Sequence, residues 1–153
     1  MLSYEDSGTS LFQSRVILVI EDNPGDVRLM KEALRDTALN VTLEVVDDGE
    51  KALAFLHHQG DFSTVRRPSL IFLDLNLPKG TSKEVLRHIK SDPDLRIIPV
   101  AVLTSSDAEH DIREVYDLYA NCYLRKPVDL DSFMTTIRNT VHFWMDIACT
   151  PRE

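Results

Sequence analysis

At residues 70–78 the chain reads Leu70-Ile71-Phe72-Leu73-Asp74-Leu75-Asn76-Leu77-Pro78. A short apolar run without polar alternation is typical of a strand that is covered on both faces of a sheet. Asp74 ends the run, and a carboxylate at the tip of a buried strand costs free energy unless a partner compensates its charge. Asp74 is therefore the first candidate for a functional residue.

Three more apolar runs end near residues that can hold a cation or a phosphoryl group. They are Glu21 and Asp22 after 16–20, Thr104 after 100–103, and Lys126 after 122–124. Converging carboxylates repel one another, and a hard divalent ion such as Mg²⁺ or Mn²⁺ relieves that repulsion. The Asp74 carboxylate would then be free to form an acyl phosphate, whose oxygens an ammonium and a hydroxyl would hold. A cis bond between Lys126 and Pro127 would turn the lysine inward.

Strand-length apolar runs alternate along the chain with amphipathic stretches of helical length. We expect strands at 15–20, 42–46, 70–74, 99–103 and 122–125, and helices at 25–36, 49–58, 82–91, 108–119 and 129–147. Parallel neighbours need long, right-handed crossovers, so these units predict an α/β fold with a doubly wound, five-stranded parallel sheet. We expect the order 2-1-3-4-5 with 42–46 at an edge, which would bring Glu21, Asp22 and Asp74 together at the switch point.

The length of 153 residues predicts one domain with one substantial core. We expect the domain to cover residues 15–148 and to carry an extended last helix. The short polar segments 1–14 and 149–153 are interpreted as flexible tails. No linker follows the last expected helix, so we expect no second, output domain.

The composition excludes several classes of function. A net charge of −8 argues against direct binding of nucleic acid, whose phosphates prefer a basic surface. No apolar run approaches the ~18 residues of a membrane span, and the first residues lack a signal peptide, so we expect a cytoplasmic protein with no membrane partner. Cys122 and Cys149 lack metal or redox spacing, and the histidines show no ligand spacing, so we interpret the histidines as surface residues.

Four motifs, in their order and at their strand ends, resemble the receiver domain of two-component response regulators. They are Ile20-Glu21-Asp22-Asn23, Asp74 with Pro78 four residues later, Thr104-Ser105, and Lys126-Pro127. The resemblance covers about residues 15–147 and implies the flavodoxin-like receiver fold. It also implies a single-domain response regulator, a signalling phosphoprotein rather than an enzyme, that accepts a phosphoryl group from a sensor histidine kinase.

The resemblance implies a phosphoacceptor and a cation site. Asp74 is expected to be the phosphoacceptor. Mg²⁺ is expected to be held by Asp22 directly, by Glu21 through water, by Asp74, and by the backbone carbonyl of Asn76. A glycine is usual in the family eight residues after the phosphoacceptor; this chain instead has Ser82 there, two residues after Gly80.

The resemblance also implies a switch. Thr104 and Lys126 are expected to sense the phosphoryl group, and Tyr123 to rotate inward after them. Asn76 and Ser106 occupy positions that tune the lifetime of the phosphorylated state. Tyr123 is equally compatible with ordinary packing, and Ser106 with capping of the next helix. The surface expected to change is formed by residues 108–119, 122–125 and 129–147.

Further features resemble the stand-alone Rcp-type regulators that are partnered by cyanobacterial phytochromes and related kinases. They are the long connection at 57–69, the segment Ser91-Asp92-Pro93-Asp94-Leu95-Arg96-Ile97-Ile98-Pro99-Val100 and the terminal pair Phe143-Trp144. They imply a phytochrome-type kinase as the phosphodonor, and they allow a downstream phosphotransfer protein as the next acceptor.

The end of the last expected helix predicts a homodimer. A helix of about twenty residues is roughly 30 Å long, whereas a five-residue strand spans about 17–20 Å, so the helix should overhang the sheet. The core-facing stripe is expected to comprise Leu130, Phe133, Ile137 and Val141. An exposed apolar cluster at the overhang is typical of an interface, to which we assign Phe143, Trp144 and Ile147. A collapsed or frayed tail is the alternative.

Two other classes of function fit less well. A phosphohydrolase of the haloacid dehalogenase kind carries the motif Asp-x-Asp, with a second aspartate as the general acid. This chain has Asn76 two residues after Asp74, so the general acid is missing. A flavodoxin-like redox carrier needs a hydroxyl- and glycine-rich phosphate loop after the first strand. Glu21 and Asp22 stand there and would repel a flavin phosphate.

Overall fold

The structure is a computed structural model that describes residues 14–35 and 37–151. The tail expected at 1–14 lies outside the described residues except for Ser14, as do the last two residues of the tail expected at 149–153. Among the described residues, every helix is too short or too polar to cross a membrane.

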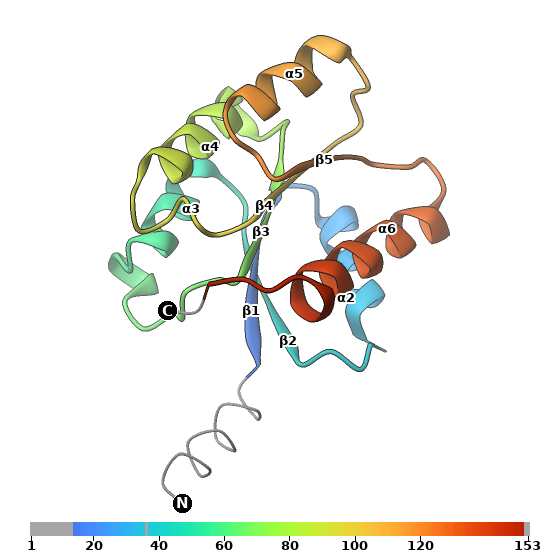
Figure 1. The fold of residues 1–153 in the computed structure, drawn as a ribbon, viewed down its shortest axis with the longest axis horizontal. Coiled ribbons are helices and arrows are strands. Elements are labelled where there is room, and N and C mark those ends of the chain that lie inside the picture. The colour runs from blue at the N-terminus through green and yellow to red at the C-terminus, as the bar shows by residue number, and fades with distance from the viewer. Residues whose placement is uncertain (1–13, 36, 152–153) are drawn as a thin grey trace, which may run out of the picture.

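The protein is built on a five-stranded parallel sheet (Figure 1). Its strands are β1 (Arg15–Ile20), β2 (Val41–Val46), β3 (Leu70–Asp74), β4 (Val100–Thr104) and β5 (Cys122–Arg125). They lie in the order β2-β1-β3-β4-β5, which confirms the predicted fold, including the position of β2 at an edge. The central strands β3 and β4 are buried along their whole length, as their uninterrupted apolar runs predicted.

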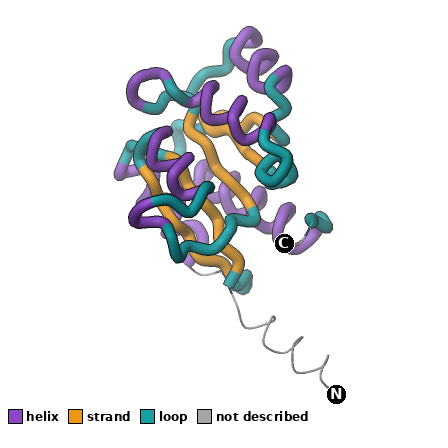
Figure 2. The backbone as a smooth tube through the Cα atoms, turned by 90° about the vertical axis from the view of Figure 1, so that its left-hand side faces the viewer, coloured by secondary structure: helices purple, strands orange, loops and turns teal. Residues whose placement is uncertain are grey.

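Helices cover both faces of the sheet, which the tube view shows as strands enclosed between helical layers (Figure 2). They are α2 (Pro24–Arg35), α3 (Gly49–Leu56), α4 (Ser82–Ser91), α5 (Glu109–Asp117) and α6 (Leu130–His142). Shorter turns are η1 (Gly60–Phe62), η2 (Pro78–Gly80) and the π-helical η3 (Phe143–Ile147). The five predicted helices are confirmed, although α3 and α5 end two residues before the predicted limits and η3 follows α6 in place of its last turn.

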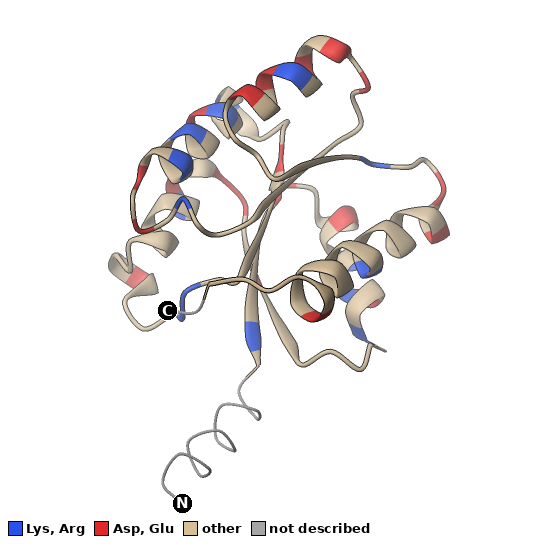
Figure 3. Cartoon of the chain, viewed as in Figure 1, with Lys and Arg blue, Asp and Glu red and all other residues tan. Residues whose placement is uncertain are grey.

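Two apolar layers hold the helices to the sheet. One packs α3, α4 and α5 against one face, and the other packs α2 and α6 against the opposite face. Phe55, Leu86 and Val115 belong to the first layer, and Met30 and Ile137 to the second. Burying each such side chain contributes on the order of 1.5–3 kcal/mol. Charged residues are concentrated on the helices and loops, whereas the strands are largely uncharged (Figure 3).

Side-chain caps determine where three of the helices begin. The Asn23 Oδ1 accepts hydrogen bonds from the backbone N–H groups of Gly25 and Asp26, at 2.9 and 3.1 Å. Asp48 and Asp129 accept comparable bonds at the starts of α3 and α6. A cap satisfies backbone donors that have no partner inside the helix. The cap at Asn23 also fixes the direction in which the chain leaves Glu21 and Asp22.

The last helix differs from the prediction at both ends. Phe133, Ile137 and Val141 face the core, but the fourth predicted member of that stripe, Leu130, is 59% exposed. Leu130 is the first residue of α6 and lies before the part of the helix that contacts the sheet and α2. At the other end, Trp144 packs against the core, whereas Phe143 is 46% and Ile147 60% exposed.

Candidate functional site

Three carboxylates meet at the carboxyl ends of β1 and β3. Glu21 and Asp22 follow β1, and Asp74 ends β3. Each offers one oxygen, and these oxygens all lie within 4.8 Å of one another. Glu21 and Asp74 are buried and Asp22 is exposed, so the cluster opens to solvent on one side. The predicted convergence of these residues is therefore found.

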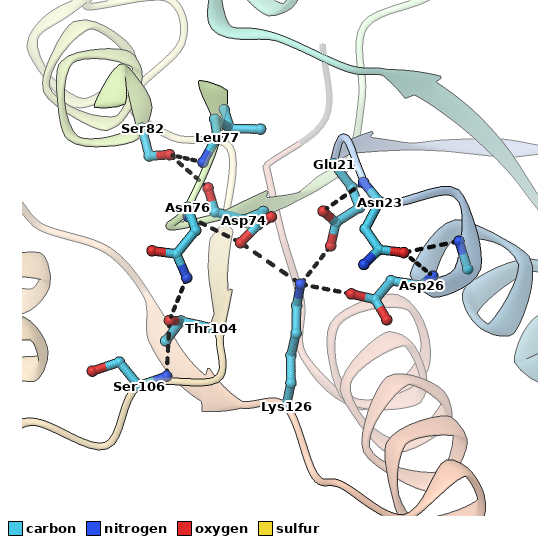
Figure 4. Close-up of polar contacts among 11 residues, drawn as sticks. Glu21, Asn23, Asp26, Asp74, Asn76, Leu77, Ser82, Thr104, Ser106 and Lys126 are labelled. Atoms are coloured by element: carbon cyan, nitrogen blue, oxygen red, sulfur yellow. Dashed lines mark hydrogen bonds and ion pairs between the residues drawn. The ribbon is translucent and has the colours of Figure 1, made fainter. Parts of the chain in front are cut away.

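Lys126 lies at the centre of this cluster (Figure 4). Its Nζ is 2.6 Å from the Glu21 Oε1, 2.9 Å from the Asp26 Oδ2 and 3.6 Å from the Asp74 Oδ1. The backbone N–H of Lys126 donates to the Thr104 carbonyl at 2.7 Å, which fixes the start of the side chain beside β4. The predicted cis bond before Pro127 is wrong, because the described residues contain no cis peptide. The long lysine side chain reaches the carboxylates from a trans bond.

The charges of the cluster are strongly coupled. Burial, together with the neighbouring Asp74, raises the pKa of Glu21 to about 8, while Lys126 opposes the change. Burial also acts to lower the pKa of Lys126, but its bonds to Glu21 and Asp26 outweigh burial and leave that pKa above its ordinary value. The ammonium is thus retained. A single lysine cannot neutralise all of the four carboxylates around it, which are Glu21, Asp22, Asp26 and Asp74.

The loop after Asp74 is held by Ser82. The Ser82 hydroxyl donates to the Asp74 carbonyl at 2.7 Å and accepts from the Leu77 N–H at 3.2 Å. Gly80, which comes two residues before it, has φ of +64°, a left-handed conformation that glycine adopts without strain. The departure from the family pattern at Ser82 therefore places a buried hydroxyl where it ties the first turn of α4 to the backbone of Asp74.

Thr104 and Asn76 lie next to the carboxylates. Thr104 is fully buried, and its Oγ1 accepts from the Ser106 N–H at 3.1 Å and lies 3.5 Å from the Asn76 Nδ2. The Asn76 N–H donates to the Asp74 Oδ1 at 3.0 Å. These contacts link the tips of β3 and β4 (Figure 4).

Ser106 and Tyr123 are joined to the loop before α5. The Ser106 hydroxyl donates to Asp111 at 2.8 Å and accepts from the Ala108 N–H at 3.2 Å, so it organises the start of α5. The Tyr123 hydroxyl donates to the Ser106 carbonyl at 2.7 Å, and its ring packs against the apolar layer under α3, α4 and α5. Tyr123 therefore both packs and bonds to the loop that Thr104 begins.

Sequence reasoning missed Asp26 as a member of the site. Its carboxylate comes from the first turn of α2 and pairs with Lys126 across a separation of 100 residues. An available signal was its place four residues after Asp22, which puts both carboxylates near one end of the helix. Ser82 was named as a departure from the family pattern, but its bond to the Asp74 carbonyl was not foreseen.

The donor set fits a hard divalent cation. Carboxylate oxygens are the ligands that Mg²⁺ and Mn²⁺ take, with water completing the shell of Mg²⁺ on the open side. The raised pKa of the buried Glu21 is consistent with uncompensated negative charge in the cluster. Glu21, Asp22 and Asp74 are the residues that would hold such an ion.

A family model of the response regulator receiver domain matches residues 17–138. The chain belongs to the response regulator receivers. This receiver is 42% identical over 137 residues to the response regulator Rcp1 of Synechocystis, covering 90% of this chain and 93% of Rcp1. The family functions in two-component signalling. This receiver is linked to phytochromes through its similarity to Rcp1 and the homologues of Rcp1.

Solved structures of related receivers share the fold. The phosphorylated cyanobacterial phytochrome response regulator RcpA matches with a TM-score of 0.87 and 42% identity, over 91% of this receiver and 99% of that chain. The Mn²⁺-bound form of Rcp1 matches with a TM-score of 0.85 and 42% identity, over 90% of this receiver and 99% of that chain. One relative is thus known in a phosphorylated form and another with a divalent metal.

Proposed function

We propose that this receiver accepts a phosphoryl group on Asp74 from a phosphohistidine of a sensor kinase, with Mg²⁺ bound by Glu21, Asp22 and Asp74. The observation that carries the proposal is the meeting of those three carboxylates within 4.8 Å beside the Lys126 ammonium. A receiver relative that is phosphorylated and another that binds Mn²⁺ support the same chemistry.

The chain's own groups have separate roles in this transfer. A carboxylate oxygen of Asp74 attacks phosphorus, the phosphorus–nitrogen bond breaks, and the imidazole leaves with the electron pair. The bound cation supplies neutralisation of the phosphoryl charge. Lys126, 3.6 Å from the Asp74 Oδ1, needs a small movement to contact a phosphoryl oxygen. The Thr104 hydroxyl and the backbone carbonyl of Asn76 would complete the phosphoryl and cation sites.

A phytochrome-type histidine kinase is the partner that the relatives favour. Rcp1 and RcpA share 42% identity with this receiver, and RcpA is a cyanobacterial phytochrome response regulator. The proposal includes transfer onward to a phosphotransfer protein and a place in the cytoplasm, where sensor kinases present their phosphohistidine.

Intact-mass measurement after incubation with an acyl phosphate tests the phosphoacceptor. The wild-type protein is expected to gain one phosphate with Mg²⁺ and none in EDTA. Asp74→Asn keeps the size of the side chain and removes the nucleophile, so it should gain none. Equal, alkali-labile labelling of Asp74→Asn would show that the phosphoacceptor is another residue.

We propose that phosphorylation changes the surface of α5, β5 and α6. Thr104 is bonded to the Ser106 N–H, and the Ser106 carbonyl receives the Tyr123 hydroxyl, so movement of Thr104 is passed to β5 through two hydrogen bonds. Asn76 and Ser106 are placed to tune the lifetime of the acyl phosphate. A local charge that biases such an element acts as a switch.

Hydrogen exchange on the phosphorylated protein tests this route. Thr104→Ala should still accept phosphate but lose the phosphate-dependent change in exchange over α5 and β5. Ser105→Ala, at the exposed neighbouring residue, is the matched control and should respond like wild type. A full response in Thr104→Ala would rule out the route through this hydroxyl.

A further inference from the structure

Two histidines face each other across helices α3 and α4, away from the carboxylate site. His57 caps the C-terminus of α3, directly after Leu56, and His88 lies in the last turn of α4. Their Nε2 atoms are 2.8 Å apart, and the two rings are perpendicular with centroids separated by 5.0 Å. The two helices lie side by side on one face of the sheet (Figure 1). Both imidazoles are exposed and open to solvent.

Asp92 completes a set of three ligand atoms. It lies four residues after His88, which places both side chains on one side of the end of α4. One oxygen of Asp92 and one nitrogen of each histidine all lie within 4.8 Å of one another. The Asp92 Oδ1 accepts from the N–H groups of Asp94 at 2.8 Å and Leu95 at 3.3 Å. The carboxylate is thus oriented by the backbone, as the ligands of metal sites commonly are.

We propose that His57, His88 and Asp92 form a second metal site, which binds a transition-metal ion of the Zn²⁺ class. Imidazole nitrogen suits Zn²⁺, Ni²⁺ and Cu²⁺, whereas Mg²⁺ takes oxygen ligands, so the ligand types separate this site from the carboxylate site. Three protein ligands and one water complete a tetrahedral zinc shell. Nitrogen ligands at ~2.0–2.1 Å from such an ion lie about 3.4 Å apart, which the exposed rings reach by a small rotation.

The packing of α3 on α4 favours this arrangement. Gly49 at the start of α3 approaches α4 so closely that an added Cβ would lie 2.7 Å from the Thr81 Oγ1. This contact and the buried Phe55 and Leu86 hold the two helices in one register. The backbones that carry His57 and His88 are therefore fixed before a metal binds, which lowers the entropic cost of ordering the ligands.

A second group with a histidine shows what distinguishes the proposed site. His110, Asp111 and Glu114 also offer ligand atoms within 4.8 Å of one another. There, however, the Lys83 Nζ lies 2.7 Å from Glu114 and 3.9 Å from Asp111, so a lysine already supplies the positive charge. No lysine or arginine ion pair is found for Asp92 among the described residues. His110 therefore provides a matched control.

Zinc titration of the full-length protein tests the proposal. Excess Mg²⁺ is added first to fill the carboxylate site, and Zn²⁺ is then followed by competition with a chromophoric chelator. Wild type is expected to bind one Zn²⁺ at the histidine site. Mutation of a residue that only orients a metal ligand typically lowers metal affinity by about 10–100-fold, and loss of the ligand itself should cost no less. We therefore expect binding to be weakened by at least about tenfold in each of His57→Ala, His88→Ala and Asp92→Asn. His110→Ala should bind like wild type.

Substitution with Co²⁺ gives a readout that does not depend on affinity alone. A tetrahedral Co²⁺ site with two imidazoles absorbs visible light, and this band should be present in wild type and His110→Ala but absent in His88→Ala. Circular dichroism establishes that each variant is folded. Equal zinc affinity in wild type and His57→Ala, or an unchanged cobalt spectrum in His88→Ala, would overturn the proposal. Neither result bears on phosphorylation of Asp74, so the two proposals can fail separately.

Discussion

The Nζ of Lys126 lies 2.9 Å from the Oδ2 of Asp26, and this ion pair joins the residue after β5 to the first turn of α2. Lys126 is thereby shared among Asp26, Glu21 and Asp74, and it lies farther from the phosphoacceptor than from the other two. Asp26 therefore competes with Asp74 for the ammonium before a phosphoryl group arrives.

Removing this competition should speed phosphorylation. Asp26→Asn removes one of the two short ion pairs of Lys126, so the ammonium is held by Glu21 alone and can shift toward Asp74 more easily. It also removes a negative charge that repels the phosphodonor. Ion pairs that are partly exposed contribute about 0.2–1 kcal/mol, which corresponds to an increase of up to about fivefold in the rate of labelling by an acyl phosphate. Glu32→Gln, on the exposed side of the same helix where Glu32 pairs with Arg35, is the control and should label at the wild-type rate. Slower labelling of Asp26→Asn would show that Asp26 assists the transfer.

The raised pKa of Glu21 predicts how stability depends on pH in the absence of metal. In the folded state Glu21 holds its proton up to about pH 8, against 4.5 for an ordinary glutamate. The folded state therefore binds more protons than the unfolded chain between these values, so the free energy of unfolding should fall as pH rises from about 4.5 to 8 and then level off. Glu21→Gln cannot titrate and should lack this contribution when denaturation in EDTA is compared with wild type.

Addition of Mg²⁺ should reverse the effect at the upper end of that range, because the ion binds the ionised carboxylates of the folded protein. Stability gained on adding Mg²⁺ is expected to be larger at about pH 8 than at about pH 5, because Glu21 must lose its proton to bind the ion. The same gain at both values would contradict the assignment of Glu21 to the cation site.

The hydroxyl of Ser82 should stabilise the protein. Ser82→Ala leaves the Leu77 N–H and the Asp74 carbonyl without this partner in a buried position, which costs about 1–3 kcal/mol. Ser91 lies in the same helix and bonds the Arg87 carbonyl on the exposed surface, so Ser91→Ala should be nearly neutral. Urea denaturation of the two variants measures the difference, and equal stability would show that Ser82 does not hold the loop.

The apolar segment after α6 still predicts a homodimer, but the structure changes which residues are expected to form the interface. Trp144 packs against the core, and the Phe143 ring contacts the Trp144 ring edge-on. Replacing Trp144 would therefore disturb the fold as well as an interface. Phe143→Ala with Ile147→Ala removes exposed area instead. Sedimentation is measured at a protein concentration on the order of tens of micromolar, which suits a dimer with a micromolar dissociation constant. It should show a dimer for wild type and a monomer for the double variant. Leu130→Ala, at the other end of α6 and 59% exposed, should remain dimeric. A wild-type monomer with or without phosphate would reject the interface.

The strands, the helices and the chemical groups of the main site were predictable from local sequence. The buried run that ends at Asp74 has the pattern of a covered strand, and caps such as Asp48 and Asp129 lie beside the helices they begin. Parallel strands place their carboxyl ends at one edge, so the meeting of Glu21, Asp22 and Asp74 followed from strand order alone.

Tertiary packing alone decided which side chains touch across the chain. The pairs of Lys126 with Asp26 and of His57 with His88 join residues 100 and 31 positions apart. A periodic pattern reports which face of a helix is buried, but not how far that helix is turned or shifted against its neighbour. These contacts depend on that shift, and the packed core fixes it: the close approach of Gly49 to Thr81 and the layer under α3 and α4 bring His57 to His88. The sequence by itself therefore determined which chemical groups meet at the predicted cation and phosphoryl site. The packed structure determined which carboxylates Lys126 contacts and brought His57, His88 and Asp92 together.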